Sequence, residues 1–590
     1  MGWPQRIAGV LAHPRWPWAA ALLGVLLASP ALGAGFQLDD HLHRFVVGLH
    51  VQGDGLGSWW DLYVAAEGDE ALTRARMDQG FAPWWTVPDL RVRFLRPLSA
   101  ATHYVDYAAW PERPELMHAQ SLAWYAALTV AVGALLRRWL GPTWVAGLAT
   151  LIFAIDDAHG TPVSWIAQRN ALISATLTVL ALWAHDRSRR DDWRAGAWWG
   201  PILLGLALLA AEASVAALGY LGAHALLLEP GDGEPWSRRT GRGVRALVPY
   251  VAVVVAWRVL YDGLGYGAQG SGVYLDPVHE LPAFLGALPD RMAALGLSQW
   301  AWPSADAWAG QPTPWAARWW ALAMGVGLVL VLVPRARSDR GLMVAMVGAV
   351  AALVPAAVTV PDDRLLLLVG VGGSAVTAMV PAVALGLGPH RSPGWSRALA
   401  GLASVPLLVV HLGLAPVSLT VRAGGLGDRI EQPQRDAVAS LPDDAVLASQ
   451  DLVIVNSPPT FVSSTLWLWR WGSEQALPRR LRVLGSTFGP VIVQRPDDRT
   501  LVLQPVGGYF GDPWSALARG RGHPFAAGDE VVLDGWRVEI LGVAQGLPTV
   551  VRVTFERSLE DPGFRWVTWQ GGRFEPFAVP EIGSRVALPG

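Results

Sequence analysis

Eleven long apolar segments recur along the first 420 residues of this chain, and they constrain its fold more than any other feature. A helix needs roughly 20 residues to cross a bilayer, and several of these segments approach or reach that length. Only 16% of the 590 residues are charged and 52% are hydrophobic, whereas soluble proteins carry about 25% charged residues. The sequence therefore predicts a polytopic α-helical membrane protein with about 11 transmembrane helices, at 18–34, 116–138, 141–157, 168–185, 197–211, 213–229, 246–262, 316–334, 341–360, 365–387 and 396–416.

Arginine placement orients these segments, because short cytoplasmic loops carry an excess of basic residues. The arginines before segment 1, after segment 4 and between segments 8 and 9 all fall on one side if the N-terminus is cytoplasmic. Since 197–229 lies between two arginine-rich loops, it is expected to form two short crossings with a turn at Ala211-Glu212-Ala213. A single long buried helix is the alternative. Small residues near Ala34 also leave open the alternative that the first segment is a cleaved signal peptide.

The polar motifs between the apolar segments fall on the opposite, non-cytoplasmic side. They are Asp39-Asp40, Asp156-Asp157-Ala158-His159, Glu212 and Asp362-Asp363-Arg364. Charged groups near lipid are costly and are usually kept for function. The first outer loop, 35–115, is rich in tryptophan, as in Pro83-Trp84-Trp85, and such segments favour short helices in the headgroup zone.

The membrane part, 1–420, is followed by a different kind of sequence at 421–590. Alternating stretches broken by Gly, Pro and Asp predict a mainly β domain outside the cytoplasmic membrane. These stretches are 446–455, 491–494, 500–504, 530–543 and 549–555. A net charge of −2 gives no reason to expect nucleic acid, and the absence of cysteine excludes disulfides and thiolate metal sites.

A series of motifs resembles one family of membrane enzymes. The family is the GT-C fold of lipid-linked-sugar glycosyltransferases, especially the protein O-mannosyltransferase-like members that often carry tetratricopeptide repeats. The resemblance covers roughly 36–375. Its motifs are Asp39-Asp40, the string Phe94-Leu95-Arg96-Pro97-Leu98-Ser99, Asp106-Tyr107, His118, the loop from Asp156 to Arg169, Ala211-Glu212, Pro249-Tyr250 with Arg258, and Asp363-Arg364.

The chain also departs from the family pattern. Asp156 stands where the family usually has a histidine, Thr161 where it has a glutamate, and Ala211 where it has a lysine. The tetratricopeptide repeats are replaced by the β domain. These losses leave open a different sugar or a site without activity.

The resemblance implies inverting transfer of a hexose such as mannose from a polyprenyl phosphate to a protein or glycan acceptor outside a bacterial inner membrane. In that scheme a carboxylate takes the acceptor's proton, cations stabilise the leaving lipid phosphate, and membrane helices hold the prenyl chain. The expected catalytic residues are Asp39 and Asp40. The expected substrate and phosphate ligands are Arg364, Arg258, Arg169, His159, Glu212 and His118.

Each of these residues also has a structural interpretation. Asp39-Asp40 can cap a helix, Arg364 can pair with its neighbouring aspartates, Arg96-Pro97 can fix the exit of the loop into the membrane, and the histidines can serve as hydrogen-bonding groups. A divalent cation at Asp156-Asp157 beside His159 is a further alternative, and no other cofactor is expected. The competing functions are a lipid or solute transporter and a GT-C-derived protein without catalysis. A transporter should show internal repeats, and none is visible in the sequence.

Overall fold

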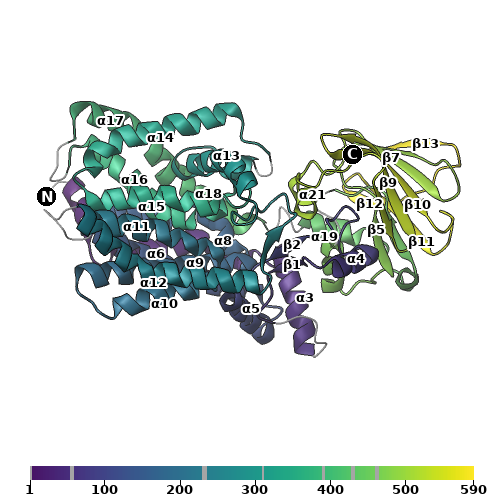
Figure 1. Cartoon of the computed structure of the whole chain (residues 1–590), viewed down its shortest axis with the longest axis horizontal. Helices are drawn as coiled ribbons and strands as arrows, with labels where there is room; N and C mark the ends of the chain where they lie inside the picture. The colour runs from purple at the N-terminus through teal and green to yellow at the C-terminus, as the bar shows by residue number, and fades with distance from the viewer. Residues whose placement is uncertain are drawn as a thin grey trace. The chain divides into compact units, whose positions relative to one another are not determined.

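A computed structural model of the chain describes residues 3–52, 59–228, 236–308, 311–387, 392–426, 432–458 and 464–589. It divides into two compact units (Figure 1). Unit 1 comprises Met1–Tyr63, Phe94–Leu264 and Leu281–Leu426, and unit 2 comprises Val64–Arg93, Gly265–Glu280 and Gly427–Gly590. Unit 2 thus takes in two pieces of the predicted outer loops in addition to the C-terminal region.

Unit 1 is helical, and a helix covers most of each of the eleven predicted segments. Among the described residues, six helices are long and apolar enough to cross a membrane, so the exact number of crossings stays a prediction. The helices are α1 (Trp3–Ala12), α2 (Trp16–Ala28), α3 (Asp39–Gln52), α5 (Pro97–Ala109), α6 (Pro114–Trp139), α7 (Trp144–Ala154), α8 (Gly160–Ser164), α9 (Arg169–Arg190), α10 (Gly196–Leu208), α11 (Ala217–Leu227), α12 (Trp236–Gly263), α13 (Leu281–Trp300), α14 (Trp315–Ala336), α15 (Arg340–Ala356), α16 (Leu367–Ala384), α17 (Gly394–Leu408) and α18 (Ala415–Leu426).

The outer helices of unit 1 expose large apolar side chains. Val259 on α12, Trp319 on α14 and Leu402 on α17 are each at least 65% exposed. A water-soluble surface does not carry continuous apolar faces of this kind. Helix α16, by contrast, is buried, and Gly372 lets its backbone approach the carbonyl oxygen of Ala345 on α15. Small residues at such contacts are typical of packed membrane helices, and unit 1 is therefore a multi-pass membrane protein.

The predicted break near Glu212 is confirmed. Helix α10 ends at Leu208, and a short 3-10 helix, η4 (Glu212–Ala216), precedes α11. Helix α11 runs parallel to α9, since Ser214 donates to Ser174 and His224 contacts Asp186. Helix α10 runs the other way, since its first residue packs against the last third of α9. The single long helix is thus excluded, and Glu212 lies at the turn of a helical hairpin.

Unit 2 is rich in β-structure, as predicted for the C-terminal region. It contains a six-stranded antiparallel sheet in the order β13-β6-β7-β10-β9-β8, a four-stranded mixed sheet in the order β12-β11-β4-β5, and a three-stranded sheet β1-β2-β3. The elements are β1 (Val64–Glu67), α4 (Glu70–Gln79), β2 (Arg91–Arg93), β3 (Gly267–Gln269), α19 (Gln432–Ala439), β4 (Asp451–Ile454), α20 (Ser464–Gly472), β5 (Arg480–Val483), β6 (Val491–Gln494), β7 (Thr500–Pro505), α21 (Pro513–Ala518), β8 (Glu530–Leu533), β9 (Trp536–Ala544), β10 (Leu547–Phe555), β11 (Phe564–Gln570), β12 (Arg573–Pro576) and β13 (Arg585–Leu588).

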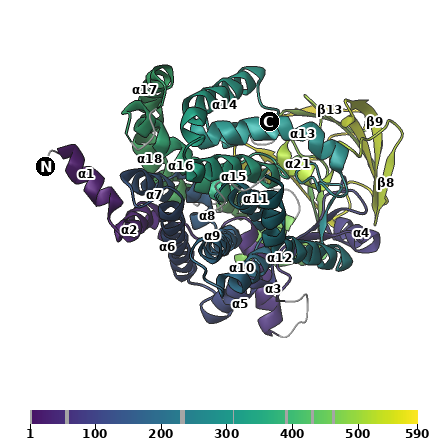
Figure 2. The same cartoon turned by 60° about the vertical axis from the view of Figure 1, so that its left-hand side comes forward.

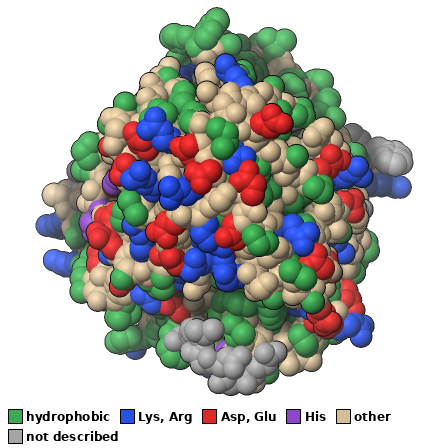
Figure 3. All heavy atoms as spheres, turned by 90° about the vertical axis from the view of Figure 1, so that its right-hand side faces the viewer, with side chains coloured by type: hydrophobic (Ala, Val, Ile, Leu, Met, Phe, Trp, Pro, Cys, Tyr) green, Lys and Arg blue, Asp and Glu red, His purple; other side chains and the backbone are tan. Residues whose placement is uncertain are grey.

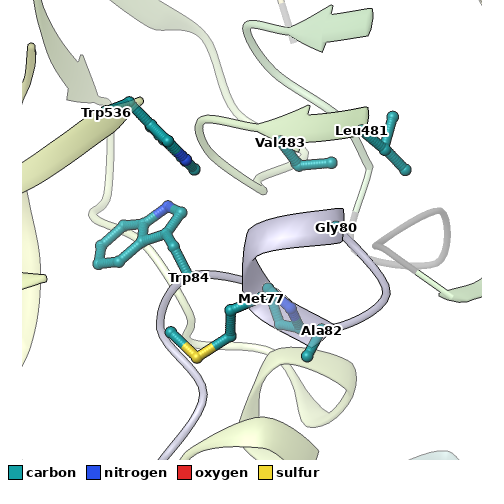
Figure 4. A pocket seen from close by; sticks show the side chains of 8 residues that line it. Met77, Gly80, Ala82, Trp84, Leu481, Val483 and Trp536 are labelled. Atoms are coloured by element: carbon teal, nitrogen blue, oxygen red, sulfur yellow. The ribbon is translucent and has the colours of Figure 1, made fainter. Parts of the chain in front are cut away.

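The tryptophans of 64–93 correct one prediction. Trp84 and Trp85 do not face a headgroup zone, because they are almost fully buried in the core of unit 2. The Trp84 indole donates to the carbonyl of Leu484, and its ring faces Trp536 across a gap lined by Met77 (Figure 4). That gap measures about 10 Å³, which is too small for anything beyond one water molecule. These residues therefore build the core of unit 2 and do not form a substrate site.

Ion pairs also organise unit 2. The buried carboxylate of Asp451 on β4 pairs with Arg479 at 2.7 Å, Arg482 at 2.9 Å and Arg557 at 3.5 Å. A buried charge is tolerated only when it is paired in this way. Figure 3 shows one face of the molecule, on which basic and acidic side chains are interspersed, as expected for a surface in contact with water.

Candidate functional site

The adjacent carboxylates Asp39 and Asp40 lie in different surroundings. Helix α3 begins at Asp39. The Asp40 side chain is fully buried and accepts hydrogen bonds from the backbone N–H groups of Gln37 at 2.9 Å and Ala167 at 2.6 Å. It therefore ties the start of α3 to the segment before it and to the loop before α9. A carboxylate with no exposure and two backbone donors is not placed to take a proton from a substrate, which corrects the prediction of a catalytic Asp40.

Asp39, by contrast, is exposed. It makes no hydrogen bond or ion pair with the other residues that the structure describes. Many protein atoms nevertheless surround it, and this desolvation raises the pKa of Asp39, while the charges of Arg364 and Arg96 act in the opposite direction. Leu38, just before it, has a φ of 45°, a conformation that a bulky side chain rarely adopts and that is found most often at functional sites.

Arg96 is the first of two cations beside Asp39. It pairs with Glu212 at 2.8 Å and lies over the rings of Tyr63 at 4.9 Å and Phe94 at 4.6 Å. The pair joins the segment before α5 to the α10–α11 turn. The sequence assigned Arg96 to the exit of the loop, and its influence on Asp39 depends on tertiary contacts that no local pattern shows.

Arg364 is the second cation. It pairs with Asp362 at 3.1 Å and lies over the Trp165 ring at 5.0 Å. Arg364 thus forms the local ion pair that the sequence offered as one alternative, and its charge also acts on Asp39. Its contact with a phosphate stays a prediction. A guanidinium has five N–H donors, so pairing with one carboxylate leaves capacity for another anion.

Near Asp39 lies a group of uncharged polar rings. The Tyr63 hydroxyl contacts His103 Nε2 at 2.9 Å and donates to the carbonyl of Ala167 at 3.1 Å, while the His43 ring lies 4.8 Å from that of Tyr63. Burial lowers the pKa of His43 to about 3, and the nearby Arg96 adds to this effect. His43 is therefore neutral at physiological pH and serves as a hydrogen-bonding and packing group.

A second cluster is centred on Arg422 of α18 and includes Asp363, the residue before Arg364. Arg422 pairs with Asp363 at 2.8 Å, Asp306 at 3.1 Å and Asp157 at 3.5 Å. Burial and the neighbouring Asp363 and Asp362 raise the pKa of Asp306 to about 6. Arg422 thus binds three loops together and fixes the start of the segment that carries Arg364. Arg422 follows the last apolar segment, and no recognisable motif marks it in the sequence.

Four other predicted ligands lie elsewhere. Arg169 is fully buried and donates to Asp106, Ser121 Oγ and the carbonyl of Met117, so it holds the protein together and does not face a phosphate. His118 and His159 are also fully buried. His118 contacts the carbonyl of Gly35, and His159 contacts the Tyr125 hydroxyl.

The fourth is Arg258, which pairs with Asp262 at 2.9 Å and lies over the Tyr261 ring, both about one turn away on its own helix. These contacts do not connect Arg258 to Asp39. They form a local ion pair and a ring contact, and the role of Arg258 toward a phosphate stays a prediction.

The residues present do not suit a divalent cation. The charges of two arginines act on Asp39, and they compete with a metal for the carboxylate. Asp157 is engaged by Arg422, and His159 is buried beside Phe153 with a ring separation of 4.5 Å. Within the described part of the chain no group of three or more acidic, histidine or cysteine side chains is arranged to hold a metal.

Comparison with known proteins gives distant likenesses only. No protein-family model and no curated protein sequence matches the chain. Among solved structures, ArnT from Cupriavidus metallidurans bound to undecaprenyl phosphate aligns over 78% of this chain and 85% of its own, at 13% identity and a TM-score of 0.37. The archaeal oligosaccharyltransferase AglB from Archaeoglobus fulgidus, in complex with an inhibitory peptide and a dolichol-phosphate, aligns over 80% and 64%, at 11% identity and a TM-score of 0.43. Both TM-scores lie below 0.5, so these structural likenesses are distant.

Proposed function

We propose that this protein is a membrane glycosyltransferase that moves a sugar from a polyprenyl-phosphate donor to an acceptor on the outer side of a bacterial cytoplasmic membrane. The observation that carries the proposal is Asp39, an accessible carboxylate without an ion-pair partner among the described residues, whose pKa two arginines influence. A carboxylate such as Asp39 can accept a proton, and arginine side chains can stabilise a phosphate.

The reaction proposed at this site is a single displacement. The acceptor hydroxyl transfers its proton to Asp39 as its oxygen bonds to the anomeric carbon of the sugar. The bond between that carbon and the phosphate oxygen breaks, and the polyprenyl phosphate leaves with the electron pair. One displacement inverts the configuration at the anomeric carbon. The raised pKa of Asp39 makes it a better base, because this pKa then lies closer to the pH at which the protein works.

Arg364 and Arg96 are the groups proposed for the leaving phosphate. Negative charge grows on the phosphate oxygens as the bond breaks, and a fixed guanidinium stabilises this charge best where water is scarce. The rings of Trp165 and Tyr63 hold the two guanidinium groups in place. Glu212 acts indirectly, through its ion pair with Arg96.

The donor is proposed from its physical requirements. A sugar carried on a polyprenyl chain keeps its lipid part among the apolar helices of unit 1 and offers its phosphate at the membrane surface. A hexose such as mannose and a protein or glycan acceptor are the expected partners. The N-terminus is placed in the cytoplasm and unit 2 outside, as the arginine pattern predicts.

The test is a transfer assay with purified protein, radiolabelled lipid-linked sugar and a cell-envelope extract as acceptor. Asp39→Asn preserves the shape of the side chain and removes the base, so turnover should fall by about 10²–10⁴-fold. Asp192→Asn is the matched control, since Asp192 is exposed in the loop between α9 and α10. Arg364→Ala should instead weaken donor binding.

Two results would count against the proposal. Full activity of the Asp39→Asn protein would remove the assigned base. Absence of transfer by the wild-type protein from every donor tried, with normal folding, would favour a protein without catalysis. Movement of unmodified lipid or solute across vesicles would favour the transporter.

A further inference from the structure

The N-terminal helices form an elbow outside the site described above. Helices α1 and α2 meet at His13-Pro14-Arg15 (Figure 2). A groove of about 500 Å³ follows the inside of this elbow, and Gly9, Val10, Trp16 and Ala19 form its apolar wall. The groove is shallow and open to its surroundings.

The elbow is held in place by contacts with the rest of unit 1. The Trp16 indole donates to the carbonyl of Gly147 at 2.9 Å. Arg137 on α6 donates to the carbonyl of Ala12 at 2.8 Å. Gly147 also lets α1 approach α7, since a Cβ atom there would lie 2.1 Å from the carbonyl oxygen of Leu11. The groove is therefore part of the folded unit.

The charges at the groove are basic. Arg6 and Arg15 both line it and both are exposed, and no acidic side chain lies among the lining residues. The surface beside the groove is apolar, with Ile7, Val10 and Trp18 each at least 50% exposed. Arginines at the edge of an apolar surface suit a molecule that has an anionic head and hydrocarbon chains.

We propose that the elbow binds a membrane phospholipid with an anionic headgroup. Its phosphate contacts Arg6 and Arg15, and part of an acyl chain lies against Val10, Trp16 and Ala19. The lipid is a structural ligand that holds α1 at the membrane surface, and it does not take part in the transfer reaction proposed above. Its position beside the first membrane helix is separate from Asp39 and Arg364.

The proposal can be tested by native mass spectrometry of the detergent-purified protein, titrated with phosphatidylglycerol or phosphatidylcholine. The wild type should bind at least one phosphatidylglycerol more tightly than phosphatidylcholine. In the double variant Arg6→Gln, Arg15→Gln this preference should be lost, with a fall in phosphatidylglycerol affinity of about 5-fold per arginine. The matched control is Arg194→Gln, Arg337→Gln, which removes two exposed arginines from other loops.

A second variant tests the groove without a change of charge. A side chain at Gly9 would meet nothing within 4 Å, so Gly9→Leu fills the groove without disturbing the contact between α1 and α7. It should lower phosphatidylglycerol binding while thermal unfolding in lipid-free detergent stays unchanged. Unaltered binding by the Gly9→Leu protein or by the double arginine variant would overturn the proposal. An equal loss in the control would also overturn it, because binding would then depend on total charge.

Discussion

Asp39 and Asp40 show what a motif can and cannot predict about single residues. The acidic pair pointed to this place in the chain, and its two members differ: Asp40 is buried and accepts two backbone N–H bonds, whereas Asp39 is exposed and is the proposed base. Neighbouring residues on a helix point in directions about 100° apart. Which of the two faces solvent depends on how the loop from Ser164 to Gln168 packs, and the local sequence contains no signal for that.

The pair allows one matched comparison. Asp40→Asn replaces an acceptor of two backbone N–H bonds by an amide that can satisfy only one of them, so we expect the free energy of unfolding to fall by about 1–3 kcal/mol. Asp39→Asn should leave stability unchanged or slightly raised, because it removes a desolvated charge. Thermal unfolding in detergent measures both. Equal destabilisation by the two substitutions would contradict the roles assigned here.

The pH dependence of activity follows from the direction of the Asp39 pKa. The base must be ionised, and its pKa in the folded protein lies above the ordinary value of 3.8. Activity should therefore fall with decreasing pH at a higher pH than an ordinary aspartate would require. The measurement is kcat/KM against pH for the wild type, with the Arg96→Met protein for comparison. Loss of that positive charge should move the acidic limb to still higher pH.

Asp306 gives a prediction about stability. Its pKa rises from 3.8 to about 6 in the folded protein, so folding favours the protonated form. The resulting stabilisation is present below pH 3.8 and is lost as the pH rises through 6. Asp306→Asn should therefore raise stability at pH 8, by about 1 kcal/mol after allowance for its partly exposed side chain, and have little effect at pH 4. Melting curves at the two pH values, with Asp192→Asn as the control, measure this.

At the scale of elements, apolar length was the reliable signal. All eleven predicted segments contain helix, and the turn at Glu212 follows from the requirement that both flanking arginine-rich loops lie on one side. The strands β6, β7, β9 and β10 were also visible as alternating stretches. Strands β5 and β13 were not, because their pairing partners β4 and β6 lie far from them in the sequence.

The buried pair Arg169–Asp106 connects α9 to α5, and we expect it to be important for stability. Arg169→Met alone leaves the Asp106 carboxylate buried without its partner, which typically costs about 3–5 kcal/mol. The double variant Arg169→Met, Asp106→Leu removes both charges and should recover most of that loss. Thermal unfolding of the two single variants and the double variant measures their coupling. Additive effects would show that the pair contributes little.

At the scale of the whole molecule, the sequence predicted two parts but not how the chain builds them. The C-terminal region was expected to be a continuous domain beginning at residue 421. Tertiary contacts that join 64–93 and 265–280 to it have no sequence signature, because the tryptophans of the first segment are equally typical of a headgroup zone.

The orientation of the chain remains a prediction and has its own test. With the N-terminus in the cytoplasm, a reporter active only in the cytoplasm should work when inserted after Arg190 and fail when fused to the C-terminus. A periplasmic reporter should give the opposite result at both positions. Cytoplasmic activity of the C-terminal fusion would refute the assigned topology and with it the outer location of Asp39.

The three-piece construction of unit 2 has a consequence for biogenesis. Residues 64–93, with Trp84 and Trp85, leave the ribosome about 350 residues before β4, which at 5–20 residues per second means a wait of roughly 20–70 seconds. During that interval two large aromatic side chains lack the core that buries them, while the remaining helices enter the membrane. Nascent chains of this protein should therefore depend on a holding chaperone on the side where this loop emerges, and truncation before β4 should leave a product that is degraded quickly.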